Sequence, residues 1–250
     1  MITDVHSHLA YDELARDLDN VIKRAKDAGV KYIITSGTNH ETNIKSLELI
    51  KKYDIVKATL GIYPTHCLEL SNEDFDDELR FIKRSADKIL GIGEIGLDYK
   101  EDQKEHDKQK QCFVKFLKLA KRLNLPVIIH SRNAEFDAIE LLEAEKMRKV
   151  VMHCFCGRFN LVKRILNNRW YFSIPPIITF SFHFQKLVKE IPFEYLLTET
   201  DAPFLSPIKG KVNEPCNIKY TIKKISEIKS VSEKSAEENI FLNFQKLFLK

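Results

Sequence analysis

The chain has 250 residues, enough for one large hydrophobic core, so we expect a single domain spanning 1–250. Hydrophobic residues make up 44% and charged residues 30%, with only 8 glycines and 8 prolines, which excludes a disordered or repetitive protein. The net charge of +4 permits a polyanionic substrate but is too small for the basic surface of a dedicated nucleic-acid-binding protein.

Short β-branched or apolar runs alternate with longer amphipathic runs along the chain. The expected strands are 1–5, 31–35, 55–60, 89–93, 126–129, 149–152, 170–174 and 195–198. The expected helices are 11–28, 40–52, 73–88, 104–124, 134–146, 158–168, 181–190, 217–229 and 232–248. Strands that alternate with helices favour a parallel sheet with right-handed crossovers. Eight such units favour an α/β fold of the TIM-like (β/α)8 barrel type over an open doubly wound sheet.

No apolar run approaches the ~18 residues that a membrane-spanning helix needs, and the first residues lack the features of a secretory signal. The five cysteines lack C-x-x-C spacing, so we expect neither a disulfide framework nor a structural zinc site: they are Cys67, Cys112, Cys154, Cys156 and Cys216. These features predict a cytoplasmic protein that does not associate with membranes.

Two histidines stand two positions apart at the end of the first expected strand. Residues i and i+2 of a strand point to the same face, so His6 and His8 should project side by side. Two imidazoles at this spacing suit one metal ion, although nearby histidines are more often a polar surface pair.

Other polar residues fall where later strands end, and the active-site groups of a barrel gather at that end. These residues are His66 after the third strand, Glu94 after the fourth, His130 after the fifth, His153 after the sixth and Asp201 after the eighth. Each of these residues alone could simply be a polar side chain at the point where a strand ends and the chain reaches solvent. Together, four of these histidines and two carboxylates at one mouth indicate a metal centre: His6, His8, His130 and His153 with Glu94 and Asp201. By contrast, His40, His106 and His183 fall at or within helices and are expected on the surface.

The glycines Gly91, Gly93 and Gly96 match the spacing of a dinucleotide-binding fingerprint. That motif requires a helix at the glycines and an acidic residue about 20 positions later. Here a polar loop is expected at 97–102, and 110–125 contains no Asp or Glu. We therefore expect these glycines to leave room around Glu94 for ions and substrate.

Five motifs in chain order resemble the TatD-type metal-dependent deoxyribonucleases of the amidohydrolase superfamily. They are Asp4-Val5-His6-Ser7-His8, Gly93-Glu94-Ile95-Gly96-Leu97-Asp98-Tyr99, Pro126-Val127-Ile128-Ile129-His130-Ser131-Arg132, His153-Cys154-Phe155, and Thr198-Glu199-Thr200-Asp201-Ala202-Pro203-Phe204-Leu205 with Asn213-Glu214-Pro215. The resemblance implies a TIM-like barrel with divalent metal ions that hydrolyses phosphodiester bonds of DNA. It further implies 3′-5′ exonuclease action on single-stranded ends, with RNA as another polyanion to consider and no obligate protein partner.

The resemblance also implies a role for each matching residue. His6 and His8 would bind one ion, Glu94 would bridge two ions, and His130 and His153 would hold the second. Asp201 would coordinate the first ion and take the proton from the attacking water, which makes Asp201 and Glu94 the catalytic residues. The expected substrate contacts are His66, Tyr63, Arg132, Lys209 and Lys211, and Glu199 is expected to support a ligand from behind. Nitrogen-rich ligation favours Zn or Mn, whereas the family is usually described as Mg-dependent, so the ion's identity stays open.

The sequence departs from the family pattern at two places. The common Gly-x-His-Pro-His becomes Gly61-Ile62-Tyr63-Pro64-Thr65-His66, and a phenol is a poorer metal ligand than an imidazole. The common His-Cys-Phe-Ser-Gly becomes His153-Cys154-Phe155-Cys156-Gly157, which makes Cys156 a possible soft ligand or oxidation site.

Two other classes of function fit parts of the pattern. A metal-dependent hydrolase of small amides, lactones or phosphate esters is one, because the same barrel hosts many chemistries. It is disfavoured by Glu94, which stands where many of those relatives carry a carbamate-forming lysine. A non-catalytic DNA-binding or scaffold protein is the other, and the six ligand positions argue against it.

Overall fold

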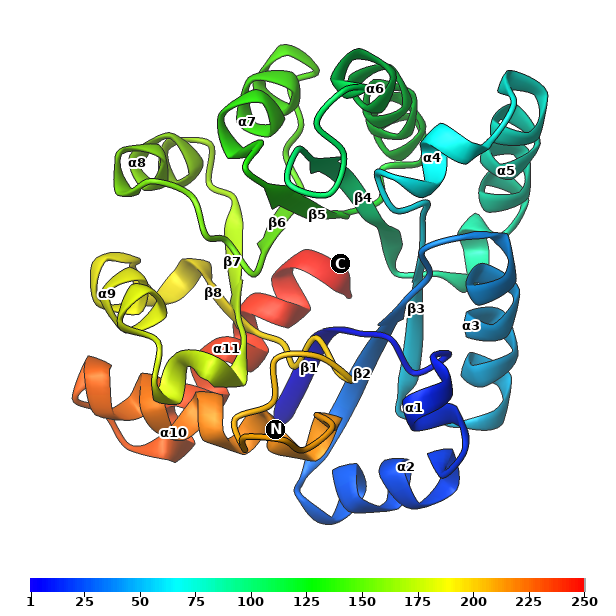
Figure 1. Ribbon diagram of the computed structural model, residues 1–250. Coiled ribbons are helices and arrows are strands. Elements are labelled where there is room, and N and C mark those ends of the chain that lie inside the picture. Colours follow the sequence, from blue (N-terminus) through cyan, green and yellow to red (C-terminus); the bar gives the residue numbers. More distant parts are fainter. Residues whose placement is uncertain (250) are drawn as a thin grey trace.

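Eight parallel strands form one sheet in the computed structural model, which describes residues 1–249 (Figure 1). The strands are β1 (Ile2–Ser7), β2 (Val30–Ser36), β3 (Val56–Leu60), β4 (Gly91–Asp98), β5 (Val127–Arg132), β6 (Val150–His153), β7 (Tyr171–Ile174) and β8 (Leu196–Thr198). Each strand pairs in parallel with the next in the chain, in the order β1 to β8. This topology confirms the predicted TIM-like (β/α)8 barrel.

Hydrogen bonds across the seam between β8 and β1 bring the two ends of the sheet together. Thr198 Oγ1 donates to the carbonyl of Thr3 at 2.7 Å, and the Asp201 amide donates to the carbonyl of His6 at 2.9 Å. The His8 amide then donates to the carbonyl of Ala202 at 2.7 Å. The seam therefore places the segment after β8 directly beside His6 and His8.

Helices surround the strands (Figure 1). They are α1 (Asp12–Ala15), α2 (Leu18–Asp27), α3 (His40–Lys52), α4 (His66–Glu69), α5 (Asn72–Arg84), α6 (His106–Leu123), α7 (Glu135–Ala144), α8 (Phe159–Asn167), α9 (Phe182–Glu190), α10 (Ile218–Lys229) and α11 (Glu233–Phe248), with 3-10 turns η1 (Ala86–Lys88), η2 (Pro176–Thr179), η3 (Phe193–Tyr195) and η4 (Pro215–Asn217). The helix expected over 11–28 is divided in two, because Asp17 leaves the helical region with φ −132°. The short helix α4 was not predicted. Among the described residues, no helix is long and apolar enough to cross a membrane.

The last helix, α11, closes the amino-terminal end of the barrel. Asn243 Nδ2 donates to the carbonyls of Phe193 and Leu196, at the beginning of β8, at 2.8 and 2.9 Å. Three buried side chains of α11 pack against buried side chains from five strands: Phe244, Leu247 and Phe248 meet Val5, Ile34, Ile128, Val151 and Leu197. With this end filled by apolar packing, the opposite end is left for polar groups.

Strand β4 is longer than predicted. It continues through Leu97 and Asp98, all of its residues are buried, and the polar loop expected from 97 begins only at Tyr99. Glu94 therefore lies within the strand, beside a register shift between Ile92 and Ile95. The glycines serve strand packing: a Cβ on Gly96 (φ 148°) would lie 1.9 Å from the His130 carbonyl oxygen. A Cβ on Gly91 or Gly93 would likewise lie 2.7 Å from the Pro126 carbonyl oxygen or 2.8 Å from Ile128 Cβ. The expectation that these glycines make room for ions and substrate was thus wrong, because all three make room for β5 and the residue before it.

Candidate metal centre

His6, His8 and Asp201 meet at the carboxyl-terminal end of the barrel. The two imidazole rings lie with centroids 4.8 Å apart, and both Nε2 atoms are 3.3 Å from Asp201 Oδ1. Ligand atoms of these three residues lie within 4.8 Å of one another, close enough to hold one ion. Asp201 reaches this position in a left-handed conformation (φ 55°), a strained geometry that often accompanies functional sites.

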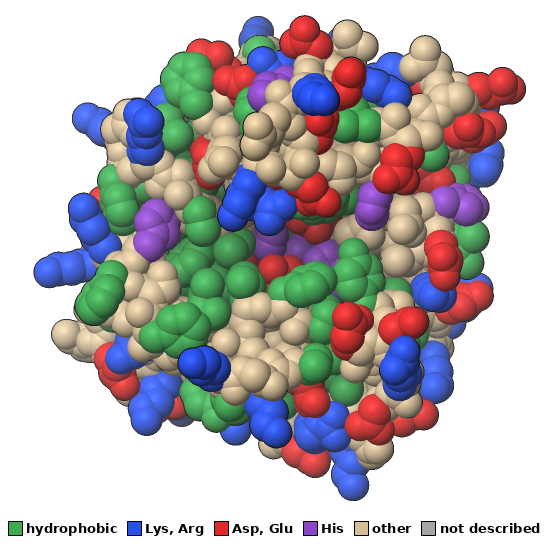
Figure 2. All heavy atoms as spheres, viewed as in Figure 1, with side chains coloured by type: hydrophobic (Ala, Val, Ile, Leu, Met, Phe, Trp, Pro, Cys, Tyr) green, Lys and Arg blue, Asp and Glu red, His purple; other side chains and the backbone are tan. Residues whose placement is uncertain are grey.

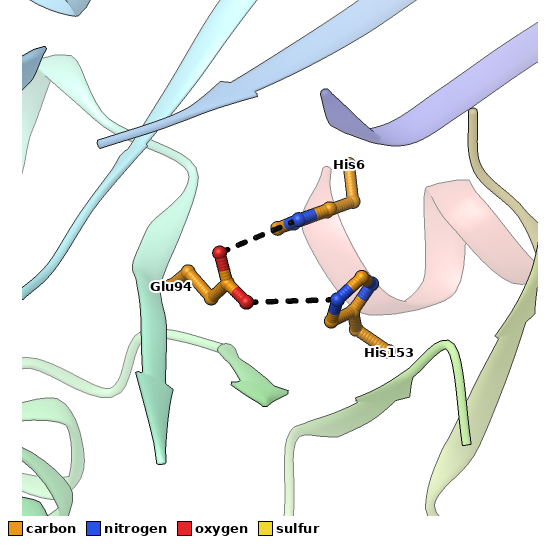
Figure 3. Close-up of side chains that lie close together, drawn as sticks. All are labelled: His6, Glu94 and His153. Atoms are coloured by element: carbon orange, nitrogen blue, oxygen red, sulfur yellow. Dashed lines mark ion pairs between the residues drawn. The ribbon is translucent and has the colours of Figure 1, made fainter. Parts of the chain in front are cut away.

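Glu94 lies between two pairs of histidines and presents one oxygen to each pair. Its Oε2 is 3.7 Å from His6 Nε2 and 3.5 Å from His8 Nε2. Its Oε1 is 2.8 Å from His130 Nδ1 and 3.6 Å from His153 Nε2. Figure 3 shows the carboxylate reaching from β4 toward His6 and His153 with a different oxygen for each.

The second nitrogen of each histidine is held by a fixed partner, as is usual for metal-binding histidines. His6 Nδ1 meets Ser36 Oγ at 3.0 Å, and His8 Nδ1 meets the Ser36 carbonyl at 3.1 Å. His153 Nδ1 meets Glu199 Oε2 at 2.9 Å, which gives Glu199 the supporting position expected of it. These contacts orient the other nitrogen of each ring toward the centre.

The buried atoms of this site fit a divalent cation. His6 Nε2 is fully buried and has no hydrogen-bond partner among the described residues. Burial, followed by the charge of His153, lowers the pKa of His6, so this imidazole stays neutral, the form that binds a cation. A mixed set of imidazole nitrogens and carboxylate oxygens suits Zn, Mn or Mg to different degrees.

Both central carboxylates remain ionised. Burial alone would raise the pKa of Glu94, but the hydrogen bond from His130 and nearby histidine charges hold it below its usual value. The same balance lowers the pKa of Asp201: burial would raise it, but the adjacent imidazoles of His6 and His8, each with Nε2 at 3.3 Å, and the charge of His153 lower it. Burial would also lower the pKa of His153, but the charge and hydrogen bond of Glu199 raise it to about 10. In the absence of a cation, the charge of these carboxylates is thus partly balanced by a proton on His153, which a bound ion would displace.

One central residue, Asp98, was not assigned a role from sequence. Its buried Oδ2 accepts a hydrogen bond from Tyr63 Oη at 2.6 Å, lies 3.0 Å from His130 Nε2, and pairs with Arg132 Nη2 at 2.7 Å. Asp98 therefore orients His130 just as Glu199 orients His153. The signal in the sequence was an acidic residue following the apolar run of β4, but Glu101 and Asp102 nearby made it resemble loop polarity.

A cavity of about 450 Å³ opens over the centre. Three of the predicted substrate contacts line it, namely Tyr63, His66 and Arg132, together with Tyr11, Phe204 and Leu205. Figure 2 shows histidine and acidic side chains at the base of this hollow. Lys209 and Lys211 are exposed on the loop after β8 and are not part of the cavity lining.

The other histidines lie outside this cavity, but only one of the three is exposed as predicted. His40 is exposed and pairs with Glu78 at 2.5 Å. His106 is half-buried because its ring stacks on Tyr99, with centroids 3.6 Å apart. His183 is half-buried and its Nε2 lies 3.0 Å from the Phe155 carbonyl. The prediction of surface positions was therefore wrong for His106 and His183.

Cys156 lies away from the ligand cluster. Its side chain lines a separate cleft with Arg158 and Asn160, and it belongs to neither group of residues that could hold an ion. The position therefore gives no support to a role for Cys156 as a soft ligand.

Comparison with known proteins identifies relatives over nearly the whole chain. The chain is 36% identical to the metal-dependent hydrolase YabD of Bacillus subtilis, covering 99% of both chains. It is 36% identical to the deoxyribonuclease TATDN3 of Homo sapiens, covering 100% of this chain and 95% of that protein. The crystal structure of YJJV, a TatD homologue of Escherichia coli, superposes with a TM-score of 0.92 at 27% identity, covering 100% of this chain and 98% of that one.

The family described as "TatD related DNase" matches residues 3–249. This match spans every residue placed in the centre, from His6 to Asp201, and agrees with the barrel shared with YJJV. The chain therefore belongs to the TatD-related DNase family of metal-dependent hydrolases.

Proposed function

We propose that this protein is a deoxyribonuclease that uses two divalent ions to hydrolyse phosphodiester bonds at the 3′ ends of single-stranded DNA. The observation that carries the proposal is the position of Glu94, whose two oxygens face two different pairs of histidines. A carboxylate so placed can bridge two cations about 3.5–4 Å apart, the spacing of two-metal hydrolases.

In this proposal His6, His8 and Asp201 would hold one ion, His130 and His153 would hold the other, and Glu94 would contribute an oxygen to each. When bound, such a pair of ions lowers the pKa of a water molecule toward 7 and stabilises the charge on the leaving oxygen. Glu199 and Asp98 keep His153 and His130 pointed at the centre. Because strands and buried partners fix all of these groups, little reorganisation accompanies the reaction.

Asp201 is the residue best placed to accept a proton from the attacking water. Its side chain is 14% exposed, whereas that of Glu94 is 4% exposed, so Asp201 is the more open carboxylate toward the cavity. The lowered pKa keeps Asp201 ionised, so its oxygens can accept a hydrogen bond from water and orient it, and a water that bound ions would acidify needs only a weak base. Glu94 is too enclosed to serve as the proton acceptor and acts by holding the ions.

The choice of DNA as substrate is supported by the family's description and by the relative named as a deoxyribonuclease. The cavity of about 450 Å³ has the size of a pocket for one small ligand, which suits the end of a strand. Tyr63, His66 and Arg132 are the proposed phosphate contacts at the mouth, and Lys209 and Lys211 would meet the backbone farther out. The five cysteines are free, as expected for the reducing cytoplasm, where we place the protein.

The decisive experiment measures cleavage of a 5′-labelled single-stranded DNA with a free 3′ end by the purified protein with Mg²⁺, Mn²⁺ or Zn²⁺ and with a chelator. We expect cleavage that the chelator abolishes and added metal restores, and loss of most activity in Glu94→Gln. A 3′-blocked strand should resist cleavage, and a matched RNA shows which sugar is preferred. Turnover of small esters or amides without any loss of DNA would overturn the proposal in favour of a small-molecule hydrolase.

A further inference from the structure

Three exposed phenylalanines follow the last two strands of the barrel. Phe180 and Phe182 lie after β7, between η2 and the first residue of α9, and Phe204 lies after β8. Their exposed fractions are 60%, 86% and 48%. All three follow the carboxyl ends of neighbouring strands, so they lie at the end of the barrel that contains the metal centre.

Figure 2 shows hydrophobic side chains gathered beside the central hollow, over η2, the start of α9 and the loop after β8. The surface is continuous with the site, because Phe204 lines the same cavity as Glu94 and Asp201. The Phe204 ring also packs against Tyr11 and His8, at centroid distances of 5.9 and 6.0 Å. An exposed aromatic patch that runs into an active site is a binding surface.

Charge is distributed unevenly around this mouth. Residues 154–186, from the end of β6 to the middle of α9, contain no Asp or Glu, and Arg158 follows directly after β6 at this end of the barrel. Lys146, Arg148, Lys149 and Arg169 precede β6 and β7 and therefore lie at the opposite end. Residues 202–213, after β8, contain Lys209 and Lys211 and no acidic residue. By contrast, α4, the start of α5 and the loop after β4 carry six acidic residues against Lys100 and Lys104: they are Glu69, Glu73, Asp74, Glu101, Asp102 and Glu105. A polyanion is therefore repelled from the α4–α5 side and attracted to the β6–β8 side.

We propose that Phe180, Phe182 and Phe204 form a stacking platform for the unpaired bases of a single-stranded nucleic acid whose terminal phosphodiester lies at the metal centre. This proposal rests on the proposed nuclease function and adds the side of the mouth over which the strand runs. Aromatic rings bind bases of any sequence through their faces, and neighbouring cations bind the backbone. Bases within a duplex are already stacked and paired, so the platform selects single strands.

A binding cycle tests the platform. Each protein is the full chain carrying Asp201→Asn, with Mg²⁺ present, so that a fluorescent single strand stays intact while its Kd is measured by anisotropy. The strand is compared with one of equal length whose bases are replaced by abasic spacers. We expect the paired variant Phe180→Ala/Phe182→Ala to bind the normal strand roughly fivefold to a hundredfold more weakly and the abasic strand equally well. Both side chains are largely exposed, so the variant loses little packing.

Phe136→Ala is the matched control. Phe136 is 51% exposed but lies on α7, where the guanidinium carbon of Arg164 is 5.2 Å from the centroid of the phenyl ring. We expect it to bind both strands as the parent does. Equal Kd values for normal and abasic strands in the parent, or a loss in Phe136→Ala in place of the paired variant, would overturn the platform. A change in self-association without a change in DNA binding would assign the patch to a second copy of the chain and also overturn it. If the wild-type protein neither binds nor cleaves DNA, the nuclease function itself fails, which is a separate result.

Discussion

Asp98, at the end of β4, accepts a hydrogen bond from Tyr63 Oη at 2.6 Å. Tyr63 lies in the loop after β3, where the family pattern commonly has a histidine. The phenol is therefore directed at the carboxylate that orients His130, and its oxygen is also 3.1 Å from His130 Nε2. Tyr63 thus takes the place of an imidazole and still supplies a polar neighbour to both Asp98 and His130. The departure from the family motif is compensated within this network.

Asp98→Asn should weaken the metal centre by loosening His130. Removing a carboxylate that orients a metal-binding histidine typically lowers metal affinity about 10–100-fold. The measurement is the Kd for Mn²⁺ or Zn²⁺ by calorimetry. Tyr63→Phe is the comparison, because it removes only one hydrogen bond to Asp98 and should weaken metal binding less than Asp98→Asn. An unchanged metal Kd in Asp98→Asn would show that Asp98 does not position His130.

Asp201→Asn should lower kcat far more than it raises the KM for DNA. A general base contributes about 10²–10⁴-fold in rate, and its proton transfer belongs to the transition state. Steady-state kinetics at saturating metal separate this effect from loss of an ion, because lost affinity would be recovered by adding metal. Turnover equal to that of the wild type would exclude Asp201 as the proton acceptor.

Removing metal should lower thermal stability. Ions that bind only the folded chain stabilise it by about 2.7 kcal/mol at a concentration 100 times Kd. The Tm should therefore fall in chelator and rise with added metal, and Glu94→Gln should lose most of that rise. His40→Ala is the control, because His40 is exposed and outside the centre, so its variant should keep the full metal-dependent shift.

Gly96→Ala should destabilise the barrel strongly. A Cβ at this position would lie 1.9 Å from the His130 carbonyl oxygen, and φ is 148°. Moving β4 away from β5 should cost several kcal/mol, roughly the upper range of single substitutions. Gly210→Ala is the matched control: Gly210 also has a positive φ, of 73°, but no atom lies within 4 Å of the added Cβ. Urea denaturation of Gly210→Ala should show a fall in the free energy of unfolding of only about 1–2 kcal/mol. Equal falls in the free energy of unfolding for the two variants would contradict the steric explanation.

The pattern of strands and the histidine pair were predictable because each depends on short-range periodicity. His6 and His8 lie side by side as the i, i+2 spacing requires, and each strand of the barrel was placed to within a few residues. Glu94 was predicted at the end of a strand but lies within β4, because the register shift after Ile92 and the contact at Gly96 depend on β5. Asp98 and Ser36 could not be assigned, because their roles arise from partners more than 25 residues away.

The seam between β8 and β1 joins the last and first strands of the barrel at the metal centre, with Asp201 beside His6 and His8. A nascent chain that has not yet emerged as far as its last strand cannot assemble this ligand set. A centre that needs all of these ligands therefore becomes competent only after Asp201 and the segment that holds it have been synthesised and have joined β1.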